Sequence, residues 1–174
     1  MGIKTIFNLL GPLTNPAGAP HQLMGVFHRD LVGIQARVLQ RLGSTHVMVV
    51  HGCDGLDELT LAGDSLVAEL KDGQVTEYTV HPEQFGLAQH DGSALRVTNP
   101  HASVDIVRRV LDNQPGPARD IVLLNAGAAL YTANVTGSLA EGVDRARQVL
   151  AEGRASEALF TFIQSTQALA ASAA

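Results

Sequence analysis

The sequence predicts an α/β protein with a central, mostly parallel sheet and flanking helices. An apolar run at 23–27, a helical pattern at 31–42 and an almost continuous apolar run at 45–51 form a strand–helix–strand unit. Alternating apolar and polar residues at 67–80 surround an Asp-Gly turn, which is typical of a β-hairpin. From residue 103 onward, the spacing of apolar residues is helical.

The strand–helix–strand unit is the best-defined part of the pattern. Its second run is rich in β-branched residues and apolar on both faces, as in a buried parallel strand. A helix that connects two parallel strands makes a right-handed crossover in nearly all proteins. The predicted buried face of this helix is formed by Leu31, Ile34, Val38, Leu39 and Leu42.

Four helices are expected in the C-terminal part. The helix at 103–111 is predicted to direct Val104, Val107 and Leu111 inward. The segment 120–134 is apolar on all sides, which predicts burial in a core or an interface. The last two helices are amphipathic, and their apolar faces consist of Leu139, Val143, Ala146 and Leu150 in one and Leu159, Phe162 and Ile163 in the other.

Composition limits the function classes. The chain has 174 residues, of which 45% are hydrophobic, so residues 1–174 are expected to form one domain with a real core. The net charge of −5, the lack of a basic block and the absence of Trp argue against a nucleic-acid partner. No apolar stretch approaches the roughly 20 residues of a membrane helix. The single cysteine, Cys53, fits a reducing compartment, and we expect a cytoplasmic protein.

The strongest candidate site is the loop His51-Gly52-Cys53-Asp54-Gly55-Leu56-Asp57-Glu58. It follows a buried strand, and α/β sheets bind ligands beyond the carboxyl ends of their strands. Asp57 and Glu58 offer adjacent carboxylates, which are oxygen ligands suited to Mg²⁺. The alternative is a solvated acidic turn in which Asp54 or Asp57 caps a helix, and spacing alone leaves both interpretations open.

A second unusual segment is Gly11-Pro12-Leu13-Thr14-Asn15-Pro16. Each proline fixes its own φ and restricts the residue before it, so this turn is rigid. Such a turn can serve as one wall of a small-molecule pocket or simply as a structural connection. No Gly-rich phosphate-binding loop follows a predicted strand anywhere in the sequence.

Several segments together resemble the anthranilate phosphoribosyltransferase family. Residues 2–16, GIKTIFNLLGPLTNP, are similar to its G-x-R-T-x-F-N-x-L-G-P-L-x-N-P segment, with Lys4 in place of the usual arginine. Gly25-Val26-Phe27 and the block at 51–58 resemble the next two family segments in the same order. Leu124-Asn125-Ala126 with Ala129-Leu130-Tyr131 resembles a late helix. The resemblance extends from residue 2 to about residue 165.

The resemblance implies an activity and a site. The family transfers phosphoribosyl from 5-phosphoribosyl 1-diphosphate (PRPP) to anthranilate with Mg²⁺, in tryptophan biosynthesis. The family's metal-binding Asp-Glu pair corresponds to Asp57 and Glu58. The proline that lines the family's anthranilate path corresponds to Pro12, with Gly11 beside it. The implied fold is nucleoside-phosphorylase-like. No catalytic acid or base is expected in this chain, because an aniline-type amine is already neutral and needs positioning more than a base.

The family's phosphate loop and its anthranilate-contacting arginine precede the segment at which this sequence begins. We therefore expect residues 1–174 to be the C-terminal portion of the catalytic α/β domain, without the helical N-terminal domain through which the family forms homodimers. Alone, such a fragment is expected to be inactive, and to self-associate through its uncovered apolar faces. Two alternatives are a related nucleoside phosphorylase and a non-catalytic fragment that binds a ligand or partner.

Overall fold

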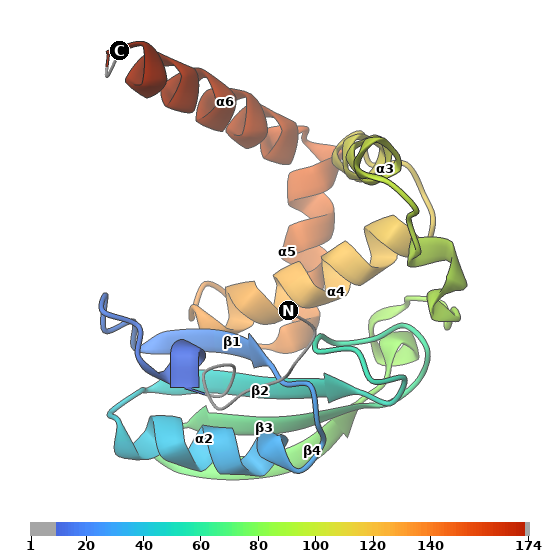
Figure 1. Cartoon of the computed structure of the whole chain (residues 1–174). Helices are drawn as coiled ribbons and strands as arrows, with labels where there is room; N and C mark the ends of the chain where they lie inside the picture. The colour runs from blue at the N-terminus through green and yellow to red at the C-terminus, as the bar shows by residue number, and fades with distance from the viewer. Residues whose placement is uncertain (1–9, 173–174) are drawn as a thin grey trace.

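The computed structural model describes residues 10–172 as a four-stranded sheet between helices (Figure 1). Helix α2 covers one face of the sheet, whereas α4 covers the other and packs against α5. Each face has its own hydrophobic core. The elements in chain order are η1 (Gly11–Leu13), β1 (His21–Gly25), α2 (Leu31–Arg41), β2 (His46–Gly52), β3 (Ser65–Lys71), β4 (Gln74–Val80), η2 (Pro82–Phe85), η3 (Gly92–Leu95), α3 (Pro100–Leu111), α4 (Pro117–Thr132), α5 (Leu139–Ala151) and α6 (Arg154–Ser172).

The α/β class is confirmed, but the sheet is mixed rather than mostly parallel. Its strand order is β1-β2-β3-β4, and only β1 and β2 run parallel. A parallel return needs a long crossover, and the segment between β2 and β3 contains no helix. The β3–β4 hairpin is confirmed: Asp72 and Gly73 have φ of 50° and 75°, the positive values that a tight type I′ turn requires.

The β1–α2–β2 unit is confirmed, but the predicted face of α2 is only partly correct: Leu39 is buried and Leu31 is half-buried against the same core. Val32, Ala36 and Leu39 are its buried apolar residues. Ile34 and Leu42, predicted to lie inward, are exposed. Ala36 is completely buried, and its small side chain lets the helix approach the sheet along this stripe.

Helices α4 and α5 pack so closely that their glycines lie backbone to backbone. A Cβ at Gly142 would overlap the carbonyl oxygen of Gly127, and a Cβ at Gly127 would lie 2.6 Å from the Val143 amide nitrogen. Backbone atoms cannot move aside as a side chain can. These two glycines therefore determine how closely the helices approach.

Gly142→Ala is expected to lower the free energy of unfolding by about 1–3 kcal/mol, because the new methyl group forces the helices apart. The matched control is Gly33→Ala in α2, where the added methyl meets only the flexible ends of Glu77 and Arg37. That control is expected to be neutral or to stabilise by up to about 1 kcal/mol through helix propensity. Urea denaturation of both variants tests this, and equal stability of the two would contradict it.

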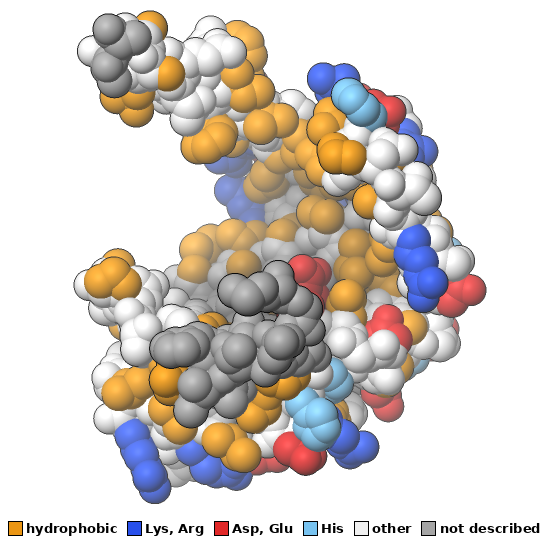
Figure 2. Space-filling view, in the orientation of Figure 1, with side chains coloured by type: hydrophobic (Ala, Val, Ile, Leu, Met, Phe, Trp, Pro, Cys, Tyr) orange, Lys and Arg blue, Asp and Glu red, His pale blue; other side chains and the backbone are white. Residues whose placement is uncertain are grey.

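The predicted inward face of α3 is only partly correct, because Leu111 alone of its three residues packs against the core. Val104 and Val107 of α3 are exposed, and Val110 is its buried residue. Leu159, Phe162 and Ile163 of α6 are all exposed, because this helix leaves α5 and projects away from the sheet (Figures 1 and 2). Among residues 10–172, no helix combines the length and the apolar character needed to cross a membrane.

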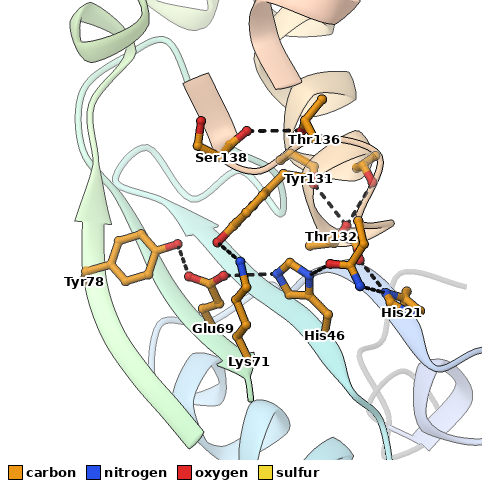
Figure 3. Close-up of polar contacts among 12 residues, drawn as sticks. His21, His46, Glu69, Lys71, Tyr78, Tyr131, Thr132, Thr136 and Ser138 are labelled. Atoms are coloured by element: carbon orange, nitrogen blue, oxygen red, sulfur yellow. Dashed lines mark hydrogen bonds and ion pairs between the residues drawn. The ribbon is translucent and has the colours of Figure 1, made fainter. Parts of the chain in front are cut away.

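A polar network joins the C-terminal end of α4 to three strands of the sheet (Figure 3). The buried His46 ring of β2 lies 2.7 Å from Oδ1 of Asn134 and 3.1 Å from the Glu69 carboxylate of β3. Tyr78 of β4 donates a hydrogen bond to the same carboxylate at 2.8 Å. Burial and the Glu69 charge raise the pKa of Tyr78, so its hydroxyl remains protonated as a donor.

Candidate functional site

The acidic loop lies at the edge of the sheet where both parallel strands end. Gly25, the last residue of β1, pairs with Val50 near the end of β2, so the carboxyl ends of these strands are adjacent. A Cβ at Gly25 would overlap the backbone carbonyl of Asp57. The end of β1 is therefore in direct contact with the loop that follows β2. This is the edge at which α/β sheets bind ligands, as expected from the sequence.

The Asp54 carboxylate forms hydrogen bonds within the loop. Its carboxylate accepts hydrogen bonds from the Leu56 amide at 3.3 Å and from the Thr60 hydroxyl at 2.9 Å. The Gly52 amide donates to the Leu56 carbonyl at 2.8 Å and closes the turn. These bonds occupy Asp54 and leave Asp57 and Glu58 as the outward-facing acidic pair.

Asn125 of α4 holds the loop from the other side. The Leu59 amide donates to Oδ1 of Asn125 at 3.0 Å, and Nδ2 of Asn125 donates to the Leu59 carbonyl at 2.9 Å. Nδ2 also donates to the Ile121 carbonyl at 3.1 Å, within its own helix. Leu59 is completely buried. Leu59, the residue that follows Glu58, is thus held in place by hydrogen bonds of its backbone and by the burial of its side chain.

This role of Asn125 was not predicted from the sequence, although Asn125 belongs to the family motif. Its signal is local: between Asp120 and Thr132, only Asn125 and Tyr131 have side chains that form conventional hydrogen bonds. An amide in an otherwise apolar helix requires a buried partner. No sequence pattern identifies that partner, which lies 66 residues away.

Asp57 and Glu58 are exposed residues with adjacent negative charges. Partial burial raises the pKa of the Glu58 carboxyl, and the charge of Asp57 raises it further. A bound cation would offset both effects. Within residues 10–172, no cluster of three or more His, Cys, Asp or Glu side chains could hold a metal by itself. A divalent ion at this pair would therefore need further ligands from water or substrate.

Gly11 and Pro12 lie at the opposite end of β1 from the acidic pair. The Pro12 carbonyl accepts a hydrogen bond from Gln22 at 3.3 Å, near the start of β1. Pro12 also lines a hollow of about 230 Å³ together with Ser44, which precedes β2. The structure thus does not bring the two predicted parts of the site together. Residues 2–9 of the family motif lie outside the described residues.

Gly25→Ala is expected to displace the acidic loop, because the added methyl group cannot coexist with the Asp57 carbonyl. We expect a loss of about 1–3 kcal/mol in unfolding free energy, with faster amide exchange concentrated between residues 53 and 64. Hydrogen-exchange mass spectrometry checks the location. Unchanged exchange in that loop would show that Gly25 does not determine its position.

A family model described as "Glycosyl transferase family, a/b domain" matches residues 1–156. This chain belongs to that glycosyl transferase family. Its relatives include the anthranilate phosphoribosyltransferase of Methylibium petroleiphilum, which is 60% identical over 97% of this chain and 49% of the relative. The enzyme of the same name from Chromobacterium violaceum is 62% identical over 91% of this chain and 46% of the relative. The predicted resemblance is confirmed.

Solved structures of the same enzyme confirm the fold of this glycosyl transferase family member. The anthranilate phosphoribosyltransferase of Thermus thermophilus is 43% identical and superposes over 94% of this chain with a TM-score of 0.84. The Saccharomyces cerevisiae enzyme in complex with PRPP and Mg is 27% identical and gives the same TM-score over 96% of this chain. The chain spans about half the length of the relatives it matches.

Proposed function

We propose that this chain forms the metal-binding half of an anthranilate phosphoribosyltransferase, which transfers phosphoribosyl from PRPP to the amine of anthranilate. The observation that carries the proposal is the Asp57–Glu58 pair, fixed at the carboxyl edge of the sheet in a chain 60% identical to an enzyme of that name. The names of the relatives favour this transferase over a nucleoside phosphorylase.

Magnesium fits the residues that are present. Asp57 and Glu58 supply two oxygen ligands, and Mg²⁺ commonly binds through one or two carboxylates, with waters and substrate phosphates completing its shell. The structure of the Saccharomyces cerevisiae enzyme, which was solved with PRPP and Mg, supports this assignment. When bound, the ion would screen the charge that develops on the departing diphosphate. Gly25 and Asn125 hold the loop that presents the two carboxylates.

The anthranilate amine is the nucleophile, and it is neutral near pH 7. It attacks the ribose carbon as the diphosphate leaves, so positioning contributes more than proton removal. Gly11 and Pro12 lie away from the acidic pair, so their geometry does not link them to the metal site. We therefore assign them to the anthranilate path on the family resemblance alone. Homodimerisation of the whole enzyme and a cytoplasmic location, without nucleic-acid or membrane partners, belong to the same proposal.

A chimera tests the function directly. This chain replaces the matched 169 residues of the Methylibium petroleiphilum relative. Loss of anthranilate fluorescence after addition of PRPP is then measured with and without Mg²⁺, for the chimera and for the chain alone. Mg²⁺-dependent consumption by the chimera supports the proposal. A folded chimera that consumes no anthranilate would overturn it.

A further inference from the structure

The hydrogen-bond ladder between β1 and β2 changes partners where it meets the acidic loop. The Val26 amide, one residue beyond β1, still donates to the Val50 carbonyl at 3.0 Å. In a regular parallel ladder, the Val26 carbonyl would then accept a hydrogen bond from the Gly52 amide. The Gly52 amide instead donates to the Leu56 carbonyl at 2.8 Å, inside the loop. The turn that begins the acidic loop therefore takes a donor away from the sheet.

The His51 ring supplies the donor that the ladder loses. Its Nδ1 lies 2.7 Å from the Val26 carbonyl oxygen. A carbonyl oxygen can only accept a hydrogen bond, so Nδ1 carries the proton in this contact. Val26 is buried, and a buried carbonyl group without a partner is unfavourable. The His51 side chain thus satisfies the group that the Gly52 amide leaves unpaired.

The ring and the acidic loop hold the end of β1 from opposite faces of the sheet. His51 pairs with Leu66 of β3, which packs into the core beneath α2, so the ring lies on the α2 face. The Asp57 carbonyl lies over Gly25 on the α4 face, the side to which Leu23 also points. Among the described residues, the ring joins no cluster of three potential metal ligands. Its effect on the acidic pair must therefore pass through the backbone.

We propose that His51 is a positioning residue for the acidic pair. Because its ring donates to the Val26 carbonyl, the Gly52 amide is free to close the turn that presents Asp57 and Glu58. Without the ring, the Val26 carbonyl competes for the Gly52 amide, and a restored ladder opens the turn. The proposal rests on the proposed function only for the identity of the bound ion, Mg²⁺. The competition for the amide does not depend on it.

Three substitutions of His51 test this competition. His51→Leu removes the donor, and His51→Gln moves the side-chain nitrogen one carbon further from the backbone. His51→Asn keeps a nitrogen donor attached to Cγ, as Nδ1 is in histidine. Hydrogen-exchange mass spectrometry of the chain should show about tenfold faster exchange at residues 52–58 for the Leu and Gln variants. The Asn variant should exchange within about twofold of the parent, because it restores the hydrogen bond.

The matched control is His21→Leu. Nδ1 of His21 also lies 2.7 Å from a backbone carbonyl, that of Thr132, but His21 begins β1, at the opposite end of the strand. This variant loses the same type of hydrogen bond and should leave exchange at residues 52–58 unchanged. In the chimera, His51→Leu and His51→Gln should raise the Mg²⁺ concentration for half-maximal rate about tenfold, with a smaller change in the rate at saturating Mg²⁺. His51→Asn and His21→Leu should keep the parent Mg²⁺ requirement.

Equal exchange of the acidic loop in His51→Leu and His21→Leu would overturn the proposal, as would a His51→Asn variant that behaves like His51→Leu. Faster loop exchange with an unchanged Mg²⁺ requirement would also overturn it, because His51 would then only stabilise the strand end. If His51→Leu does not fold, the comparison of His51→Gln with His51→Asn decides. The function fails separately: a folded chimera that consumes no anthranilate rejects the transferase, and the exchange measurements still decide whether His51 controls the loop.

Discussion

In the chimera, Asp57→Asn or Glu58→Gln is expected to lower the rate of anthranilate consumption about 100-fold at limiting Mg²⁺. Each substitution removes one of the two anionic ligands. Among the described residues, no third His, Cys, Asp or Glu joins this pair to form a metal-binding cluster. Metal stabilisation of a departing anion contributes several kcal/mol, and each 1.36 kcal/mol corresponds to about tenfold in rate. Initial rates over a series of Mg²⁺ concentrations separate weaker metal binding from a lower maximal rate.

The matched control for this pair is Asp64→Asn. Asp64 is an exposed acidic residue of the same loop, and its backbone carbonyl, rather than its side chain, accepts the hydrogen bond from Cys53. Asp64→Asn changes the net charge by the same amount and should leave the Mg²⁺ dependence intact. If the Asp57 and Glu58 variants keep the parent rate at limiting Mg²⁺, the metal assignment is wrong.

Local patterns predicted the parts of the fold that local chemistry decides. The strand–helix–strand unit follows from its apolar periodicity, and the hairpin follows from the Asp72-Gly73 turn. Which side of α2 faces the sheet depends on its neighbours. Both the predicted and the observed stripes have helical spacing, and the close fit of Ala36 against the sheet decides between them.

For helix α6, the shared apolar face was predicted from the sequence, but its exposure was not. Helical periodicity indicates which side chains share a face, but it does not indicate what covers that face. Leu159, Phe162 and Ile163 do lie on an apolar stretch, and nothing in residues 10–172 buries them. The same distinction applies to the site: the strand-end position of Asp57 followed from the sequence, whereas its separation from Pro12 depends on the packing of η1 beside β1.

Asn125→Ala is expected to weaken both the fold and the metal site. The substitution leaves the buried Leu59 amide and carbonyl without their side-chain partners, which costs about 1–3 kcal/mol in unfolding free energy. Loss of a residue that orients metal ligands typically lowers metal affinity about 10–100-fold. In the chimera we therefore expect a higher Mg²⁺ requirement with a smaller change in the rate at saturating Mg²⁺. Faster exchange of the Leu59 amide provides a readout independent of activity.

Asn99→Ala distinguishes positioning from general loss of stability. Asn99 caps α3 by accepting a hydrogen bond from the Ala102 amide at 2.9 Å, and its removal costs about 1 kcal/mol without removing a hydrogen bond of the acidic loop. This variant should lose stability and keep the parent Mg²⁺ requirement. If Asn125→Ala behaves in the same way, Asn125 only stabilises the fold. If only Asn125→Ala shifts the Mg²⁺ requirement, a contact from α4, 66 residues along the chain, helps to position the carboxylates at the ends of β1 and β2.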